Sequence, residues 1–253
     1  MSLFSSIANK SKLNAAIDQT AEARKSEGDQ ADQLYKKAYL SYEQILGTHA
    51  IFADTLYNWG FALFNHAQTK SGNEADKLYQ EATEKFLFCM VINPSNLKAA
   101  IDWGVTLMEQ ARARGADPQD VLYDLAIEKL QLAESITPGS TTYNLACIQS
   151  LRGEFDAAKE SLEAARDFGS LPDKEDILKD PDLATARRKK WFKPFMESLD
   201  FKETRAIKKA EEKAEAKAKA IAKIEAKHKD VTEKAEKKKA EKTEAKPESD
   251  NEE

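Results

Sequence analysis

The chain has 253 residues, and its 39 basic and 44 acidic side chains give a net charge of −5. It contains only 9 Gly and 7 Pro, about half their usual share, which excludes turn-rich sandwiches and barrels and predicts a mostly helical protein. No apolar run reaches the roughly eighteen residues of a membrane span, and residues 1–20 lack the apolar core of a signal peptide. We therefore expect a cytoplasmic protein without cofactor or metal, whose two Cys fill space in a core.

Residues 51–94 and 95–138 are two copies of one unit. Aligned without a gap, they share twelve identities. These are Trp59/Trp103, Gly60/Gly104, Leu63/Leu107, Ala67/Ala111, Asp76/Asp120, Leu78/Leu122, Tyr79/Tyr123, Ala82/Ala126, Glu84/Glu128, Lys85/Lys129, Ile92/Ile136 and Pro94/Pro138. Residues 7–50 follow the same register, with nine identities to the second unit. The sequence therefore predicts an array of repeats.

Each unit is predicted to be a hairpin of two helices. Apolar residues recur at helical spacing on both sides of a polar turn, as in Leu78, Ala82 and Phe86. Small polar residues occupy one register in that turn and are expected to begin each second helix as N-caps. They are Asp29, Asn73 and Asp117.

The pattern resembles the tetratricopeptide repeat, which has a small residue in its first helix, an aromatic residue and Ala in its second, and a closing Pro. Gly60, Tyr79, Ala82 and Pro94 match these positions in unit two, and residues 139–170 match as a fourth, shorter unit. Units one to three carry longer helices than the family norm. Lengthened repeats with a Trp-Gly pair are similar to those of the plant-type receptor for mitochondrial protein import, whose membrane anchor has no counterpart in this sequence.

The resemblance implies an all-α fold, a right-handed superhelical array of helix hairpins. Small residues are expected where neighbouring helices approach closely, at Gly60, Gly104 and Ala146. The expected domains are four repeats in residues 1–170 (7–50, 51–94, 95–138 and 139–170), capping helices in 171–200, and a charged tail in 201–253. The Ala/Lys/Glu-rich tail is basic in its middle and acidic at its tip, and we expect a solvated helix that frays into disorder.

The resemblance also implies that the first helices line a concave groove. The expected partner-binding residues are Asn14, Ile17, Tyr57, Asn58, Phe61, Lys98, Ile101, Asp102, Val105, Tyr143 and Asn144. Asn and Asp side chains at equivalent positions of successive units form a polar row, here called the polar ladder. Apolar side chains form a row on each side of it, and this combination suits an extended or helical peptide. The alternative interpretation is that Ile17, Phe61 and Val105 pack helix on helix.

Some members of the repeat family hold the carboxyl termini of chaperones with a clamp of Lys, Asn and Arg side chains. Only Asn58 and Lys98 match two of its five positions, and Asp102 stands where Arg is expected. Because a carboxylate at that place would repel the ligand at short range, we do not predict such a clamp.

The leading functional prediction is a non-enzymatic scaffold or adaptor that binds a protein or peptide partner. The three His have no Cys or carboxylate cluster nearby at ligand spacing, so neither a catalytic nor a metal site is predicted. One alternative is a self-assembling scaffold, a homo-oligomer formed through the apolar edge at Leu3, Phe4 and Ile7. Another is binding of nucleic acid or an acidic surface through residues 187–193 and the basic part of the tail, which interleaved Glu residues disfavour.

Overall fold

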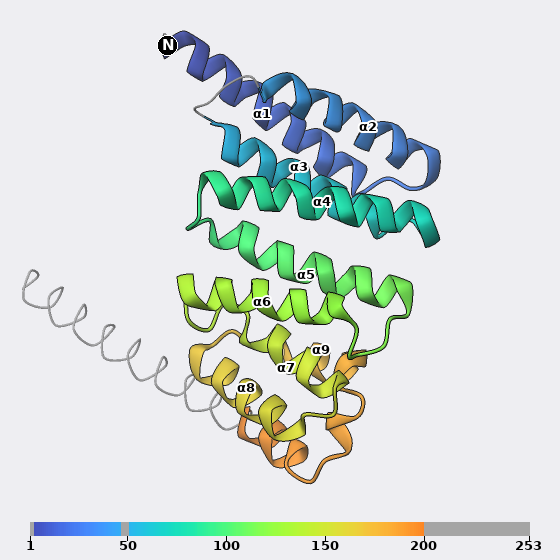
Figure 1. The fold of residues 1–253 in the computed structure, drawn as a ribbon, viewed down its shortest axis with the longest axis vertical. Helices are drawn as coiled ribbons and strands as arrows, with labels where there is room; N and C mark the ends of the chain where they lie inside the picture. Colours follow the sequence, from blue (N-terminus) through green and yellow to red (C-terminus); the bar gives the residue numbers. More distant parts are fainter. Residues whose placement is uncertain (1–2, 47–50, 200–253) are drawn as a thin grey trace, which may run out of the picture. The chain divides into compact units, whose positions relative to one another are not determined.

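The computed structural model describes the backbone of residues 3–46 and 51–199, with side chains from residue 8 onward. Every regular element in these ranges is a helix (Figure 1). The α-helices are α1 (Leu3–Ala23), α2 (Gly28–Ile45), α3 (Phe52–Ala67), α4 (Gly72–Ile92), α5 (Leu97–Arg114), α6 (Val121–Ile136), α7 (Thr142–Leu151), α8 (Phe155–Phe168) and α9 (Lys174–Lys179). The short 3-10 helices η2 (Pro181–Leu183) and η3 (Ala186–Arg188) follow, and residues 192–199 are also helical.

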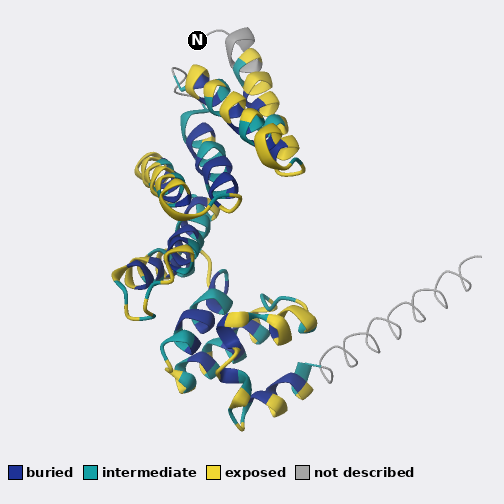
Figure 2. Ribbon diagram, turned by 90° about the vertical axis from the view of Figure 1, so that its right-hand side faces the viewer, coloured by how far each residue is buried: buried dark blue, intermediate teal, exposed yellow. Residues whose placement is uncertain are grey.

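Within residues 3–195 the helices pack as successive antiparallel pairs. Helices α1 and α2, α3 and α4, α5 and α6, and α7 and α8 form hairpins, and α2 contacts α3 as α4 contacts α5. Buried residues lie on the helix faces that meet neighbouring helices, and exposed residues lie on the outer faces (Figure 2). The prediction of an all-α helical repeat array is confirmed.

The small residues of the repeat lie at close helix approaches, as the sequence predicts. A β-carbon built on Gly60 would lie 2.9 Å from the Phe86 ring, and one built on Gly104 would lie 2.7 Å from the Leu130 side chain. Ala146 is fully buried. Each glycine therefore lets its first helix contact the second helix of the same hairpin.

The predicted N-caps are wrong by two or three residues. Helices α2 and α4 begin at Gly28 and Gly72, whose positive φ angles of 56° and 58° turn the chain directly into the helix. Asp29 and Asn73 therefore lie inside the first turn. Before α6, residues 117–120 form a turn, and the N-cap is Asp120, whose carboxylate accepts from the Leu122 N–H at 2.9 Å.

A repeated Asp links the first hairpin to the second and the second to the third. In the first link, the Asp32 carboxylate accepts from Lys70 Nζ at 2.5 Å and is 3.1 Å from His66 Nε2. In the second link, Asp76 accepts from Gln110 Nε2 at 2.9 Å and from Arg114 Nε at 2.5 Å. The positions 66 and 70 correspond to 110 and 114 in the repeat, so the same bridge is built twice with different donors.

The first of these links makes stability depend on pH. His66 is buried, is stacked on Tyr35 with ring centroids 4.5 Å apart, and has Tyr39 Oη 2.9 Å from its Nδ1. Burial lowers the pKa of His66 below its usual value, against the opposing effect of Asp32. Because the unfolded chain then binds more protons than the folded one, stability should be full above about pH 6.5 and should fall as the pH drops below it.

The matched variant is His66→Gln, which places here the residue that the second link uses at position 110. We expect urea unfolding midpoints of the wild type to fall between about pH 7.5 and pH 5.5, and those of His66→Gln to fall less. Equal falls in both proteins would contradict this role for His66.

A second repeated pair explains why Trp and Lys recur. Lys85 Nζ lies 4.8 Å from the ring centroid of Trp59, and Lys129 Nζ lies 4.3 Å from that of Trp103. Each pair joins the first and second helices of one hairpin, and a cation over an indole face is attractive.

Among residues 3–46 and 51–199, no helix is both long and apolar enough to cross a bilayer. The predicted charged tail, residues 201–253, lies outside the described residues. The apolar edge at Leu3, Phe4 and Ile7 lies on α1, in the part whose side chains are not described.

Candidate protein-binding groove

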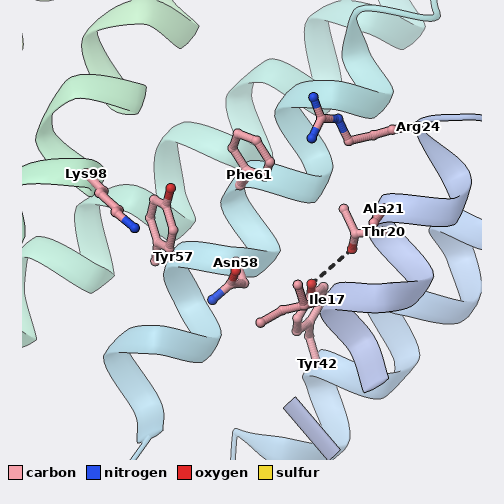
Figure 3. A pocket seen from close by; sticks show the side chains of 9 residues that line it. All are labelled: Ile17, Thr20, Ala21, Arg24, Tyr42, Tyr57, Asn58, Phe61 and Lys98. Carbon is pink, nitrogen blue, oxygen red and sulfur yellow. Dashed lines mark hydrogen bonds between the residues drawn. The ribbon is translucent and has the colours of Figure 1, made fainter. Parts of the chain in front are cut away.

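Four helices surround a pocket of about 220 Å³ near the first and second hairpins (Figure 3). Helix α1 contributes one wall, α3 the opposite wall, α2 a single Tyr and α5 a single Lys. The lining residues are Ile17, Thr20, Ala21, Arg24, Tyr42, Tyr57, Asn58, Phe61 and Lys98.

The walls combine aromatic and polar groups. Tyr57 and Phe61 stand one turn apart on α3, with ring centroids 6.3 Å apart and ring planes 24° apart. Opposite them, Thr20 Oγ1 and Tyr42 Oη are 2.9 Å apart in a buried hydrogen bond (Figure 3). Asn58 donates to the Asp54 carbonyl at 2.7 Å. The hydrogen bonds of Thr20 and Tyr42 hold the α1 wall in place, while the two α3 rings offer apolar area to a ligand.

The charges that line the pocket are both positive. The Arg24 guanidinium lies 5.4 Å from the Phe61 ring centroid, and Lys98 comes from the beginning of α5. Asp102, one turn further along α5, accepts a hydrogen bond from Tyr57 Oη at 3.0 Å and does not line the pocket. Burial raises the pKa of Asp102 above its usual range, and burial together with Asp102 raises the pKa of Tyr57.

The structure brings together part of the residue set predicted for the groove. Five of the eleven line the pocket, namely Ile17, Tyr57, Asn58, Phe61 and Lys98. Asn14 is exposed on α1, and Ile101 packs partly buried against the core between α3, α4 and α5. Val105 is half-buried on α5. Sequence reasoning missed the other four lining residues. Thr20, Ala21 and Arg24 follow Ile17 at the helical spacings of three, four and seven residues, and Tyr42 comes from α2, a second helix of the repeat, which was not expected to line the groove.

At the other end of the predicted groove, the α7 residues face residues 180–182 of the same chain. Tyr143 Oη donates to Asp180 at 2.7 Å, and Ser150 Oγ donates to the Asp182 carbonyl at 2.7 Å. Tyr143 is thus paired inside the molecule, and Asn144 lies beside it on α7, outside the pocket. The pocket therefore involves the first helices of units one to three and not that of unit four.

A buried ionic cluster fixes this segment. Arg112 on α5 bonds to Glu109 and to the buried Asp182 of η2. Cys147, Asp180 and Asp182 bring their ligand atoms within 4.8 Å of one another. Arg112 and Tyr143 already occupy carboxylate oxygens of the two Asp, and burial raises the pKa of Cys147. We therefore regard the cluster as a set of structural contacts that hold η2 against α5 and α7.

Hairpins in series, with a groove between the first helices of neighbouring units, place the chain among TPR-like helical-repeat proteins. Residues 29–159 match the family described as the plant-specific mitochondrial import receptor subunit TOM20. The match covers more than half of the chain, so the chain belongs to this family. No curated protein matches the chain.

The family is one of receptors and not of enzymes. It therefore confirms the predicted general class, a non-enzymatic, protein-binding helical protein. It corrects the predicted location, since a mitochondrial import receptor points to the mitochondrion and not to the free cytoplasm. The cytoplasmic prediction relied on the lack of a recognisable leader or span, and such a lack does not specify a compartment.

Proposed function

We propose that this protein is a receptor that binds a segment of a protein destined for import into mitochondria, and that the segment occupies the groove between α1, α3 and α5. The family supplies the class of partner. The observation that supports the site is the pocket of about 220 Å³, in which two stacked aromatic rings stand beside hydrogen-bonding and charged groups. Such a mixture of buriable aromatic area and convergent polar groups is typical of peptide grooves.

The size of the pocket suits one large side chain of the partner. A cavity of about 150 Å³ lined by apolar side chains accommodates benzene, so this pocket has room for an aromatic or branched aliphatic group. Neighbouring residues of the segment would then lie along the α1 and α3 walls, where Asn58 can hydrogen-bond to the partner's backbone. This arrangement uses the same register that the sequence predicts for a polar ladder.

We expect Phe61→Ala to weaken binding of a purified mitochondrial precursor protein about tenfold or more, because truncating a central aromatic group commonly costs about 2 kcal/mol. Surface plasmon resonance with the immobilised full chain measures this effect. The matched control is Phe88→Ala, which removes a 53% exposed aromatic group from α4, outside the pocket.

Circular dichroism should show both variants folded. Equal affinities of Phe61→Ala and the wild type, or a larger loss in Phe88→Ala, would contradict the proposed site.

A further inference from the structure

Residues 187–193 form a basic segment that does not line the pocket and that the proposed function does not use. Five of its seven residues are Lys or Arg, and positions 183–196 contain no Asp or Glu. Residues 1–201 hold 23 basic and 30 acidic side chains, and five of the 23 lie in this segment, which leaves 18 cations against 30 acids elsewhere. The segment therefore reverses the sign of the charge around it, without the interleaved Glu residues of the tail.

The segment is folded against α8 and presents its cations from a defined backbone. Phe192 and Phe195 are buried, and the Phe192 N–H donates to the Lys189 carbonyl at 3.1 Å. Lys189 Nζ lies 3.6 Å from the ring centroid of Phe155, at the beginning of α8. Exposed cationic residues are interspersed with these packed ones, and they are Arg188, Lys190 and Lys193. Because the backbone is already ordered, a ligand does not need to order it on binding.

Within the described residues, Arg188 and Lys190 form no ion pair. Arg187 donates to the Asp180 backbone carbonyl at 2.5 Å, which satisfies an N–H group but leaves the positive charge uncompensated. The two acids that flank Phe155 are exposed and form no ion pair in the described ranges either. They are Glu154 and Asp156. The segment therefore offers positive charge to an external partner.

The aromatic residues of the segment favour a bilayer surface over a nucleic acid. Trp191 is half-buried, and its ring centroid lies 5.6 Å from that of Phe192. A Trp beside Lys and Arg is typical of membrane–water interfaces, where the amphipathic ring lies at the depth of the headgroups. Single-stranded nucleic acids instead bind to exposed aromatic rings on which successive bases stack, and Phe192 and Phe195 are buried. The family, one of mitochondrial import receptors, also brings the protein next to a bilayer.

We propose that residues 187–193 bind the headgroups of anionic phospholipids and hold the protein against a bilayer surface, a contact that does not depend on the groove. The Arg188 guanidinium and the Lys190 ammonium pair with lipid phosphate oxygens, and the exposed part of Trp191 lies between headgroups. Each Lys or Arg close to an anionic surface strengthens attachment about fivefold. The attachment is therefore reversible, and it weakens as salt screens the charges.

Co-sedimentation of the full chain with phospholipid vesicles tests this proposal. One set of vesicles contains phosphatidylcholine and phosphatidylserine, and the other contains phosphatidylcholine alone. We expect binding to the anionic vesicles only, and weaker binding as the salt concentration rises. The double variant Arg188→Gln/Lys190→Gln should bind the anionic vesicles about tenfold more weakly or worse, because it lacks two of the cations.

The matched control is Lys36→Gln/Lys37→Gln, which changes the net charge by the same amount at two exposed cations of α2. It should bind the vesicles as the wild type does, and circular dichroism should show both double variants folded. The proposal would be overturned by a wild type that does not bind anionic vesicles, by binding that needs no phosphatidylserine, or by equal binding of the two double variants.

A titration with fluorescein-labelled single-stranded RNA distinguishes the other class of polyanion. RNA binding that is lost in Arg188→Gln/Lys190→Gln while vesicle binding is unchanged would overturn the lipid assignment in favour of nucleic acid. Binding of a mitochondrial precursor protein should be the same in this variant as in the wild type, because neither residue lines the pocket. Failure of vesicle binding with intact precursor binding therefore leaves the proposed function standing, whereas loss of precursor binding would overturn the independence of the two surfaces.

Discussion

Replacing Gly104 by Leu should lower the free energy of unfolding by about 3 kcal/mol, the upper part of the range for overpacked cores. Even a β-carbon at this position would lie 2.7 Å from Cγ and Cδ2 of Leu130 and 3.2 Å from the Leu130 backbone nitrogen. The side chain of Leu130 is fully buried and the backbone beside it belongs to α6, so neither can move without separating α5 from α6. Urea denaturation followed by circular dichroism measures the loss.

A double-mutant cycle separates this steric effect from other consequences of losing a glycine. Ala at an exposed helical position is more favourable than Gly by about 1 kcal/mol, so the close approach must outweigh that gain. Gly104→Ala combined with Leu130→Ala should cost less than the sum of the two single variants, because the second change makes room for the first. Strict additivity, or wild-type stability of Gly104→Leu, would show that the contact does not limit the packing of α5 on α6.

Removing the charge of Arg112 should have an effect of similar size. Arg112→Met leaves the buried carboxylate of Asp182 and the half-buried carboxylate of Glu109 without their cation, and breaking such a buried ion pair costs about 3 kcal/mol. Burial already raises the pKa of both carboxyl groups, against the opposing effect of Arg112. Their folded forms therefore bind protons more readily than their unfolded forms, and the loss should be largest near neutral pH and should shrink in acid.

Arg114→Met is the matched control, two residues along the same helix. Its partner Asp76 is shared with Gln110, and the Arg114 side chain is 42% exposed, so its removal should change stability by about 1 kcal/mol or less. Unfolding midpoints at about pH 7 and about pH 4.5 distinguish the two sites. If Arg112→Met lowers stability no more than Arg114→Met does, the Arg112 cluster does not hold η2 against α5 and α7 as we suggest.

The helical array was predictable because its determinants are local. Three features can be read directly from the sequence: the 44-residue repeat, the helical spacing of apolar residues, and the small residue at positions 60 and 104. The close contacts of Gly60 and Gly104 confirm the interpretation of these small residues. The N-caps of α2 and α4 were misplaced because a glycine with positive φ begins each of these helices. The N-cap of α6 was misplaced because residues 117–120 form a turn before the helix begins. The partners of the repeated Asp were not predicted, because the equivalent positions hold different residue types in the two links. They are His66 and Lys70 in the first link, and Gln110 and Arg114 in the second.

The groove was predictable in part, with Ile17 and Lys98 on the flanking helices and three residues between them. Tyr57, Asn58 and Phe61 lie on the middle first helix, where the repeat register defines the direction of each side chain. Arg24 was missed because it stands at the end of α1, beyond the positions that the family uses. Tyr143 was expected in the groove, but its hydroxyl donates to Asp180. This contact was not predicted because it joins residues that are far apart in the sequence.

Site-specific photo-crosslinking tests the central claim most directly. A benzophenone amino acid replaces Asn58 in the groove or Phe88 on the exposed face of α4, in the full chain, and each protein is irradiated with a mitochondrial precursor protein. We predict a covalent adduct from position 58 that disappears when Phe61→Ala is added, and little or no adduct from position 88. An adduct from position 88 without one from position 58 would contradict the claim that the groove between α1, α3 and α5 binds the partner.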